Sequence, residues 1–237
     1  MGPEPEGEAA AVERMFATIA PRYDLLNRLL SAGLDRRWRR RAVREARLGA
    51  GARALDVCSG TGDVALEIAR QVPGSGRVVG LDFAGPMLGL AARKVARAGL
   101  GRRIALVRGS ALTLPFPAGA FDAALIAFGI RNVVDVKQAL AEMHRVVRPG
   151  GRAVILEFAL PRARLLRGLY LWYFLRILPR VGRAISGHPS AYTYLPETVT
   201  RWPTPEAFAT AMTEAGFREV RWTPLTAGIV ALHVGLK

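Results

Sequence analysis

A strand, a glycine-rich turn and a helix follow one another directly within residues 54–68. The apolar run that contains Leu55 and Val57 predicts a buried parallel strand, and the amphipathic run after Gly62 predicts the start of a helix. Gly60 can adopt backbone angles that other residues avoid, and Gly62 lets a ligand approach the backbone and the helix N-terminus. This stretch therefore predicts a loop that binds a ribose or a phosphate.

The spacing of the glycines fits two kinds of nucleotide site. Gly60-x-Gly62-x-x-Ala65 satisfies the glycine pattern of dinucleotide-binding folds. Two carboxylates favour a different cofactor, since Asp56 lies within the strand before the loop and Asp82 ends the next apolar strand, where it can bind two ribose hydroxyls. This set resembles the S-adenosylmethionine site of Rossmann-like methyltransferases. The alternative is an ordinary strand-to-helix turn followed by a surface aspartate.

Strand and helix patterns alternate regularly from residue 53 to residue 158, which predicts a parallel sheet with right-handed crossovers. The sequence RPGG at 148–151 predicts a stop and a turn between a helix and a strand. The runs 216–225 and 228–237 are joined by too few residues for a helical crossover, so they must pair antiparallel. We therefore predict an α/β fold with a doubly wound, mostly parallel seven-stranded sheet and an antiparallel last strand. The expected strands span 53–58, 77–81, 103–107, 121–128 and 152–158, and the expected helices span 62–72, 86–98, 135–147 and 204–215.

A chain of 237 residues with 51% hydrophobic residues is long enough for one sizeable α/β domain. We expect a disordered tail over residues 1–10 and a single domain over residues 11–237. Helical patterns over residues 11–50 predict an N-terminal cap that covers the cofactor cleft. An apolar-rich stretch over residues 160–200 predicts a helical insertion that acts as a substrate lid.

Cysteine usage and hydropathy indicate a cytoplasmic protein. Cys58 is the only cysteine, so the chain can form no intramolecular disulfide, and no His/Cys cluster indicates a metal site. The N-terminus lacks the pattern of a secretory signal, and no apolar run has the length of a membrane span. We expect a soluble protein, or one attached peripherally to the inner face of the cell membrane, with no metal cofactor.

The net charge of +15 at pH 7 indicates an anionic partner. Seven arginines within residues 36–47 predict a positive face on one helix, for which a solvated surface and an anionic membrane surface are both open interpretations. A nucleic-acid-binding protein on the same scaffold is the alternative function. The chain lacks the interleaved aromatic and basic residues that bind single strands, so we expect no nucleic-acid partner.

Several stretches together resemble one family of methyltransferases. They include LDVCSGTGD, FGIRNVVD, EMHRVVRPGGRAVILEF and LTAGIVALHVG, and the resemblance covers residues 12–237. The chain is similar to the demethylmenaquinone/ubiquinone-biosynthesis C-methyltransferase family. This resemblance implies transfer of a methyl group from S-adenosylmethionine to the ring of a prenylated quinol, with S-adenosylhomocysteine as the second product. Naphthoquinol and benzoquinol rings both remain open, another small lipid is the alternative substrate, and a homodimer is a candidate assembly.

The resemblance also implies contacts with the cofactor. Thr61 would contact it in the glycine loop, Asp82 would bind the ribose, and Ser110 and Ala111 would lie beside the adenine, with Ala127 nearby. Two of these residues depart from the family, which usually has Asn or Asp where Ser110 stands and often Ser where Ala127 stands. A hydroxyl at Ser110 can still bond the adenine amine, whereas the side chain of Ala127 forms no hydrogen bond.

Methylating a ring carbon requires electron density, which an ionised quinol oxygen supplies. A phenol with a pKa near 10 is ionised to about one part in a thousand at pH 7, and a nearby arginine lowers such a pKa by roughly 1–3 pH units. Arg131, in the loop after the fourth strand, is our candidate for that charge and for contact with the substrate. His188 and Tyr192 are candidate catalytic bases. Four further residues are expected to contact the substrate: Tyr23, Asp24, Phe174 and Tyr194.

The stretch 161–187 carries apolar residues at helical spacing, and apolar residues also occupy its other faces. Such a helix requires burial, either against the domain as a lid or partly in a membrane interface with its arginines at the headgroups. A prenylated quinol lives in the bilayer. We therefore expect this helix, with Phe174, both to line a tunnel for the prenyl chain and to touch the membrane.

Overall fold

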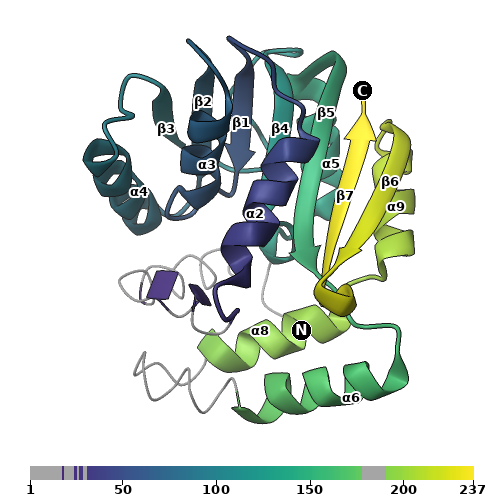
Figure 1. Ribbon diagram of the computed structural model, residues 1–237. Helices are drawn as coiled ribbons and strands as arrows, with labels where there is room; N and C mark the ends of the chain where they lie inside the picture. The colour runs from purple at the N-terminus through teal and green to yellow at the C-terminus, as the bar shows by residue number, and fades with distance from the viewer. Residues whose placement is uncertain (1–17, 19–23, 26, 29–30, 178–190) are drawn as a thin grey trace, which may run out of the picture.

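The computed structural model describes residues 18, 24–25, 27–28, 31–177 and 191–237, and Figure 1 shows one sheet flanked by helices. Its seven strands lie in the order β3-β2-β1-β4-β5-β7-β6. Neighbours among β1 to β5 pair parallel, whereas β7 runs antiparallel to both β5 and β6. The predicted fold class is therefore confirmed. The strands are β1 (Arg53–Val57), β2 (Arg77–Asp82), β3 (Ile104–Arg108), β4 (Phe121–Ala127), β5 (Val147–Phe158), β6 (Arg218–Leu225) and β7 (Val230–Leu236), with the short helix η3 (Thr226–Gly228) between the last two.

Helices pack on both faces of the sheet (Figure 1). On one face, Trp38 and Ile68 belong to a buried cluster that also contains Ala54 of β1. On the other face, Met143 and Phe208 belong to a second cluster. Successive side chains of a strand point to opposite faces, so each strand contributes to both clusters. The helices on the two faces are α2 (Leu34–Glu45), α3 (Asp63–Gln71), α4 (Gly85–Arg97), α5 (Val136–Val146) and α9 (Pro205–Glu214).

Further helices lie beyond the end of the sheet at which the parallel strands terminate (Figure 1). The π-helical turn η2 (Tyr173–Ile177) directly continues α6 (Arg164–Trp172). Helix α8 (Ala191–Arg201) contacts both η2 and the short helix η1 (Ile130–Asn132), which follows β4. The insertion expected over residues 160–200 therefore lies at the carboxyl ends of the parallel strands. None of the described helices is long and apolar enough to cross a bilayer.

The expected helix stop is borne out, since α5 ends at Val146, but the expected turn at residues 148–151 is wrong, because β5 already begins at Val147. Val147 pairs with Phe121 of β4, and the register of this pairing shifts before the regular part of the strand. Gly150 has a φ of 75°, and its N–H donates to the carbonyl oxygen of Lys237 at 2.8 Å. The turn residues therefore form an irregularity within a continuous strand that is paired on both sides.

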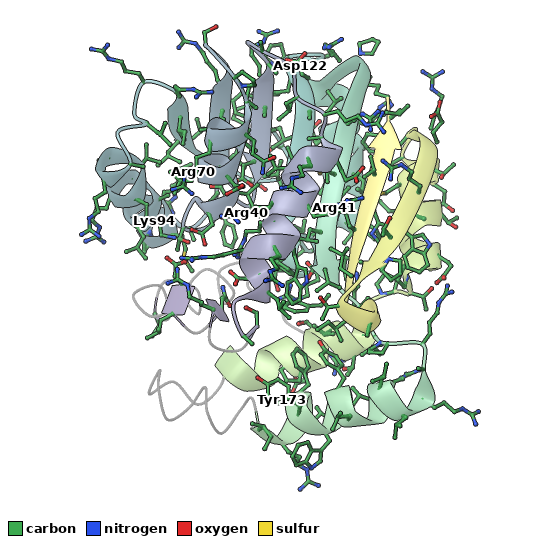
Figure 2. The ribbon with its side chains drawn as sticks, viewed as in Figure 1. Arg40, Arg41, Arg70, Lys94, Asp122 and Tyr173 are labelled. Carbon is green, nitrogen blue, oxygen red and sulfur yellow. The ribbon has the colours of Figure 1, made fainter. Side chains whose placement is uncertain are left out.

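The arginine-rich helix is α2, and several of its arginines form ion pairs within the fold. Arg39 is buried and pairs with Asp35 of α2 and with Asp63 of α3, the second at 3.6 Å. Arg41, labelled on α2 in Figure 2, pairs with Glu45 at 2.8 Å. Part of the positive charge of this helix is thus neutralised by the protein itself.

Candidate active site

A cavity of about 270 Å³ lies at the carboxyl ends of the parallel strands. Strand order reverses between β1 and β4, and ligands of doubly wound sheets bind at such a switch point. The cavity lining draws on the ends of β1, β2 and β4 and on the loop after β3. It includes five of the eight residues that we expect to bind the cofactor: Gly60, Asp82, Ser110, Ala111 and Ala127.

Glycine is required at the two loop positions for different structural reasons. Gly60 has a φ of 54°, and a Cβ atom added there would meet nothing within 4 Å. Glycine is therefore required there by the backbone conformation and not by a lack of space. Gly62 has a φ of 80°, and an added Cβ would lie 3.0 Å from the Cβ of Ala91 on α4. Gly62 therefore allows α4 to pack against the loop, a reason other than the ligand approach that we expected.

Asp82 lines the cavity and binds the backbone of two loops. One carboxylate oxygen accepts from the N–H of Gly60 at 2.7 Å, and the other accepts from the N–H of Ala84 at 2.9 Å. The side chain is buried yet lines the cavity. Each carboxylate oxygen has more than one acceptor position, so Asp82 can bind ribose hydroxyls while it holds both amide groups.

Asp56 is buried within the fold and does not line the cavity. Its carboxylate accepts from the N–H of Ala65 at 2.9 Å, in the first turn of α3, and burial raises the pKa of this carboxyl well above its usual range. This contact stabilises the start of the helix that follows the glycine loop. Direct contact of Asp56 with the cofactor stays a prediction.

Thr61 connects the glycine loop to the N-terminal cap. Its hydroxyl donates to Asp24 at 2.6 Å and accepts from the ammonium group of Lys94 at 2.9 Å. Lys94 of α4, labelled in Figure 2, also forms ion pairs with Asp24 and with Asp63, the second at 2.7 Å. Asp24 thus contacts the cofactor loop, and its expected contact with the substrate stays a prediction. The sequence analysis missed Lys94, which carries one of only three lysine charges in the chain.

Arg131 lies on η1 and forms a buried ion pair that the sequence analysis did not anticipate. Its Nη1 atom donates to Glu157 Oε1 at 2.6 Å and to the carbonyl oxygen of Phe128 at 3.0 Å. The guanidinium group also lies 5.3 Å from the ring centroid of Phe158. Burial raises the pKa of the Glu157 carboxyl, although Arg131 acts in the opposite direction. Glu157, the only charged residue of the apolar run AVILEF, was the visible signal for this site.

Phe174 is only 3% exposed, so it does not lie on an exposed face of the insertion. Its ring stacks on Tyr170 at a centroid distance of 4.8 Å and lies 6.1 Å from the ring of Phe158. Phe174 therefore packs the insertion onto the end of β5, close to the Arg131–Glu157 pair. Its contact with the substrate stays a prediction.

Four other expected residues cannot be placed at the site. Tyr23 and His188 lie outside the described residues, as does the tail over residues 1–10. Tyr192 and Tyr194 belong to α8, and their side chains lie outside the described part of the structure. Their roles stay predictions.

The family is shown by comparison with known proteins. A family model described as the ubiE/COQ5 methyltransferase family matches residues 5–237. The chain belongs to the ubiE/COQ5 methyltransferase family. It is 51% identical to the ubiquinone/menaquinone biosynthesis C-methyltransferase UbiE of Geobacter sp. (strain M21), over 95% of this chain and 96% of the relative. It is 53% identical to the demethylmenaquinone methyltransferase of Thermus thermophilus, over 93% of this chain and 99% of the relative.

Solved structures with low sequence identity show the same fold. A SAM dependent methyltransferase from Aquifex aeolicus aligns with a TM-score of 0.62 at 19% identity, over 84% of this chain and 88% of that chain. The cyclase SpnF aligns with a TM-score of 0.71 at 19% identity, over 97% and 96% of the two chains. A shared fold does not fix the reaction, which has to be inferred from family and site.

This member of the ubiE/COQ5 methyltransferase family uses S-adenosylmethionine, and the cavity fits the nucleoside part of that cofactor. Asp82 supplies acceptors for ribose hydroxyls, and the lining beyond it is mostly apolar. Ser110 accepts from the N–H of Leu112 at 3.1 Å, which leaves its own hydroxyl proton and a second acceptor position for a ligand. Among the described residues, no group of three His, Cys, Asp or Glu side chains could hold a metal ion.

We expect Asp82→Asn to weaken S-adenosylmethionine binding by at least about tenfold, because the amide loses the charge and one of the two acceptor oxygens. Isothermal titration calorimetry measures the affinity directly. Asp122→Asn is the matched control, since Asp122 lies at the opposite end of the sheet from Tyr173 (Figure 2) and accepts from the N–H of Arg53. Equal affinities for the wild type and Asp82→Asn would contradict the assignment of Asp82.

Proposed function

We propose that this protein transfers a methyl group from S-adenosylmethionine to a ring carbon of a prenylated quinol. The supporting observation is its identity of 51% and 53%, over nearly the whole chain, to relatives named for ubiquinone/menaquinone biosynthesis and for demethylmenaquinone methylation. Relatives of the two names are about equally similar to this chain. Demethylmenaquinol and the benzoquinol of the ubiquinone pathway are therefore both proposed substrates, with another small lipid as the alternative.

The proposed reaction takes place next to the cofactor cavity. When bound, S-adenosylmethionine supplies a methyl group carried on a positively charged sulfur. Asp82 and the glycine loop would hold the nucleoside, and Phe128 lines the cavity while its carbonyl oxygen accepts from Arg131. A ring oxygen close to Arg131 would lie beside a fixed positive charge, which favours the ionised quinol. Alignment of the ring carbon with the methyl group then supplies the remaining acceleration.

We also propose that α6 touches the membrane in which a prenylated quinol resides. The most exposed large apolar side chains of this helix are Leu165 (85%), Leu169 (61%) and Trp172 (57%). Arg164 and Arg167 are exposed on the same helix and suit the anionic headgroups of a cytoplasmic leaflet. Since Tyr170 and Phe174 face the protein, the same helix can contact lipid on one side and the active site on the other. This surface makes the protein a peripheral enzyme of the inner membrane face.

A methyl-transfer assay tests the proposed reaction. We expect the purified protein, supplied with S-adenosylmethionine and a reduced demethylmenaquinone, to form the ring-methylated product and S-adenosylhomocysteine, both measured by mass spectrometry. The ubiquinone-pathway benzoquinol, tested in parallel, decides which ring the enzyme prefers. Asp82→Asn should lose most of the activity at a cofactor concentration that saturates the wild type only. Absence of transfer to either quinol would contradict the proposal.

Vesicle binding tests the proposed membrane contact. We expect the double variant Leu165→Glu/Leu169→Glu to bind vesicles of phosphatidylglycerol and phosphatidylcholine at least about tenfold more weakly, because each buried leucine contributes roughly 1.5–3 kcal/mol. Thr210→Glu is the matched control for charge, because it adds a carboxylate at an exposed position of α9. Co-sedimentation measures the bound fraction. Unchanged binding of the double variant would show that α6 does not dock on lipid.

A further inference from the structure

Besides Asn132 Oδ1, which belongs to a residue that lines the cofactor cavity, two buried polar atoms near Arg131 have no hydrogen-bond partner among the described residues. They are Glu157 Oε2 and the hydroxyl oxygen of Tyr170. An unpaired buried polar group costs roughly 1–3 kcal/mol, so native structures keep few of them. Two such atoms in one region indicate a place where a ligand supplies the missing partners.

Glu157 is held with one oxygen committed and the other available. Its Oε1 atom accepts from Arg131 at 2.6 Å and from the N–H of Phe158 at 2.8 Å. The side chain of Arg131 is only 7% exposed, and that of Glu157 is 1% exposed. The carboxylate therefore keeps a fixed orientation, and Oε2 is the atom that can accept from a ligand.

Tyr170 approaches this pair from the insertion. Its ring stacks on Phe174, which lies 6.1 Å from the ring of Phe158, and the Arg131 guanidinium lies 5.3 Å from that same ring. Burial raises the pKa of the Tyr170 phenol above its ordinary range. The phenol stays protonated at neutral pH and is thus a hydrogen-bond donor. Phe158 and Phe174 add aromatic surface next to it, which suits a planar ring.

These groups match the hydroxyl of an aromatic ring, which donates one hydrogen bond and accepts another. We propose that Glu157 accepts the proton of the quinol hydroxyl and that Tyr170 holds the same oxygen by donating to it. This inference rests on the proposed function and assigns the proton acceptor, which the sequence analysis placed at His188 or Tyr192.

Each proton and electron pair of the proposed step has a defined destination. The hydroxyl proton moves to Glu157 Oε2, and the electron pair left on oxygen raises the density at the ring carbon. That carbon forms its bond to the methyl group while the methyl–sulfur bond breaks, with the electron pair going to sulfur. The hydrogen on the ring carbon then leaves as a proton to water, and Glu157 returns its proton to the ring oxygen. One methyl group is gained and one proton is released overall.

The burial of Glu157 explains why it suits this step. A buried glutamate whose pKa is raised is a stronger base than an exposed one, and general-base catalysis is most effective when the pKa lies near the working pH. When Glu157 takes the proton it becomes neutral. The positive charge of Arg131 is then no longer balanced by the carboxylate and stabilises the new oxyanion.

Glu157→Gln in the full-length protein tests the assignment, because glutamine keeps the size and one oxygen but cannot take the proton. We expect kcat at pH 7 to fall by roughly a hundredfold or more. In the wild type, kcat should rise as the pH passes upward through the raised pKa of Glu157, because only the carboxylate accepts a proton. The variant should lack this step and instead gain activity up to the pKa of the quinol itself. S-adenosylmethionine affinity should be unchanged.

Two further variants keep the test decisive. Glu45→Gln alters a carboxylate that pairs with Arg221 away from the cavity, and its pH profile should match that of the wild type. Tyr170→Phe removes only an oxygen without a partner, so the fold should be retained while kcat falls roughly tenfold. If Glu157→Gln does not fold, the kcat of Tyr170→Phe still tests the proposed site.

The outcomes separate the two proposals. A wild-type enzyme that methylates quinol, with an active Glu157→Gln of unchanged pH profile or a fully active Tyr170→Phe, would overturn this inference and leave the proposed function intact. A wild-type enzyme that methylates neither quinol would overturn both.

Discussion

The carboxylate of Asp82 is the contact on which the cofactor site depends, because it fixes two loops at once. It accepts from the N–H of Gly60, which shapes the loop after β1, and from the N–H of Ala84, which shapes the turn before α4. An apolar side chain at the end of β2 would leave both amide groups without this acceptor. The shape of the cavity therefore depends on one carboxylate at the end of β2.

Phe128 joins this cavity to the buried ion pair. It is a non-glycine residue with a φ of 60°, in the left-handed region that residues other than glycine rarely adopt. Its N–H donates to the carbonyl oxygen of Leu156 at 2.8 Å, and its own carbonyl accepts from Arg131. Backbone strain of this kind clusters at functional sites. The strained turn brings the cofactor wall and the Arg131–Glu157 pair into contact with the same residue.

Different kinds of contact join the N-terminal cap and the insertion to the rest of the fold. Thr61, Asp24 and Lys94 form one polar network that ties the cap to the glycine loop. Tyr170 and Phe174 pack the insertion against the end of β5 through aromatic contacts. Polar contacts thus fix the side that holds a charged cofactor, while apolar contacts fix the side proposed to meet a lipid ring.

Sequence patterns predicted the sheet and five of the residues that line the cavity, because these depend on local signals. Alternating strand and helix periods determine the parallel topology, and the position of Asp82 follows from the length of its strand. The turn expected at 148–151 was wrong because these residues lie within β5, between Val147 and Arg152, which both pair with β4. The burial of Phe174 was not predictable, since its helix is apolar on several faces and only tertiary contacts choose one. Glu157 was visible as a charge in an apolar strand, but its partner is 26 residues away.

Quinone analysis in a host strain that lacks this protein tests ring methylation most directly. The strain should lose its mature quinone and accumulate the form that lacks one ring methyl group, as measured by liquid chromatography and mass spectrometry. Reintroducing the wild-type chain should restore the mature quinone, whereas Asp82→Asn should restore it poorly. An unchanged quinone profile in the deletion strain would contradict quinol C-methylation as the function of this protein.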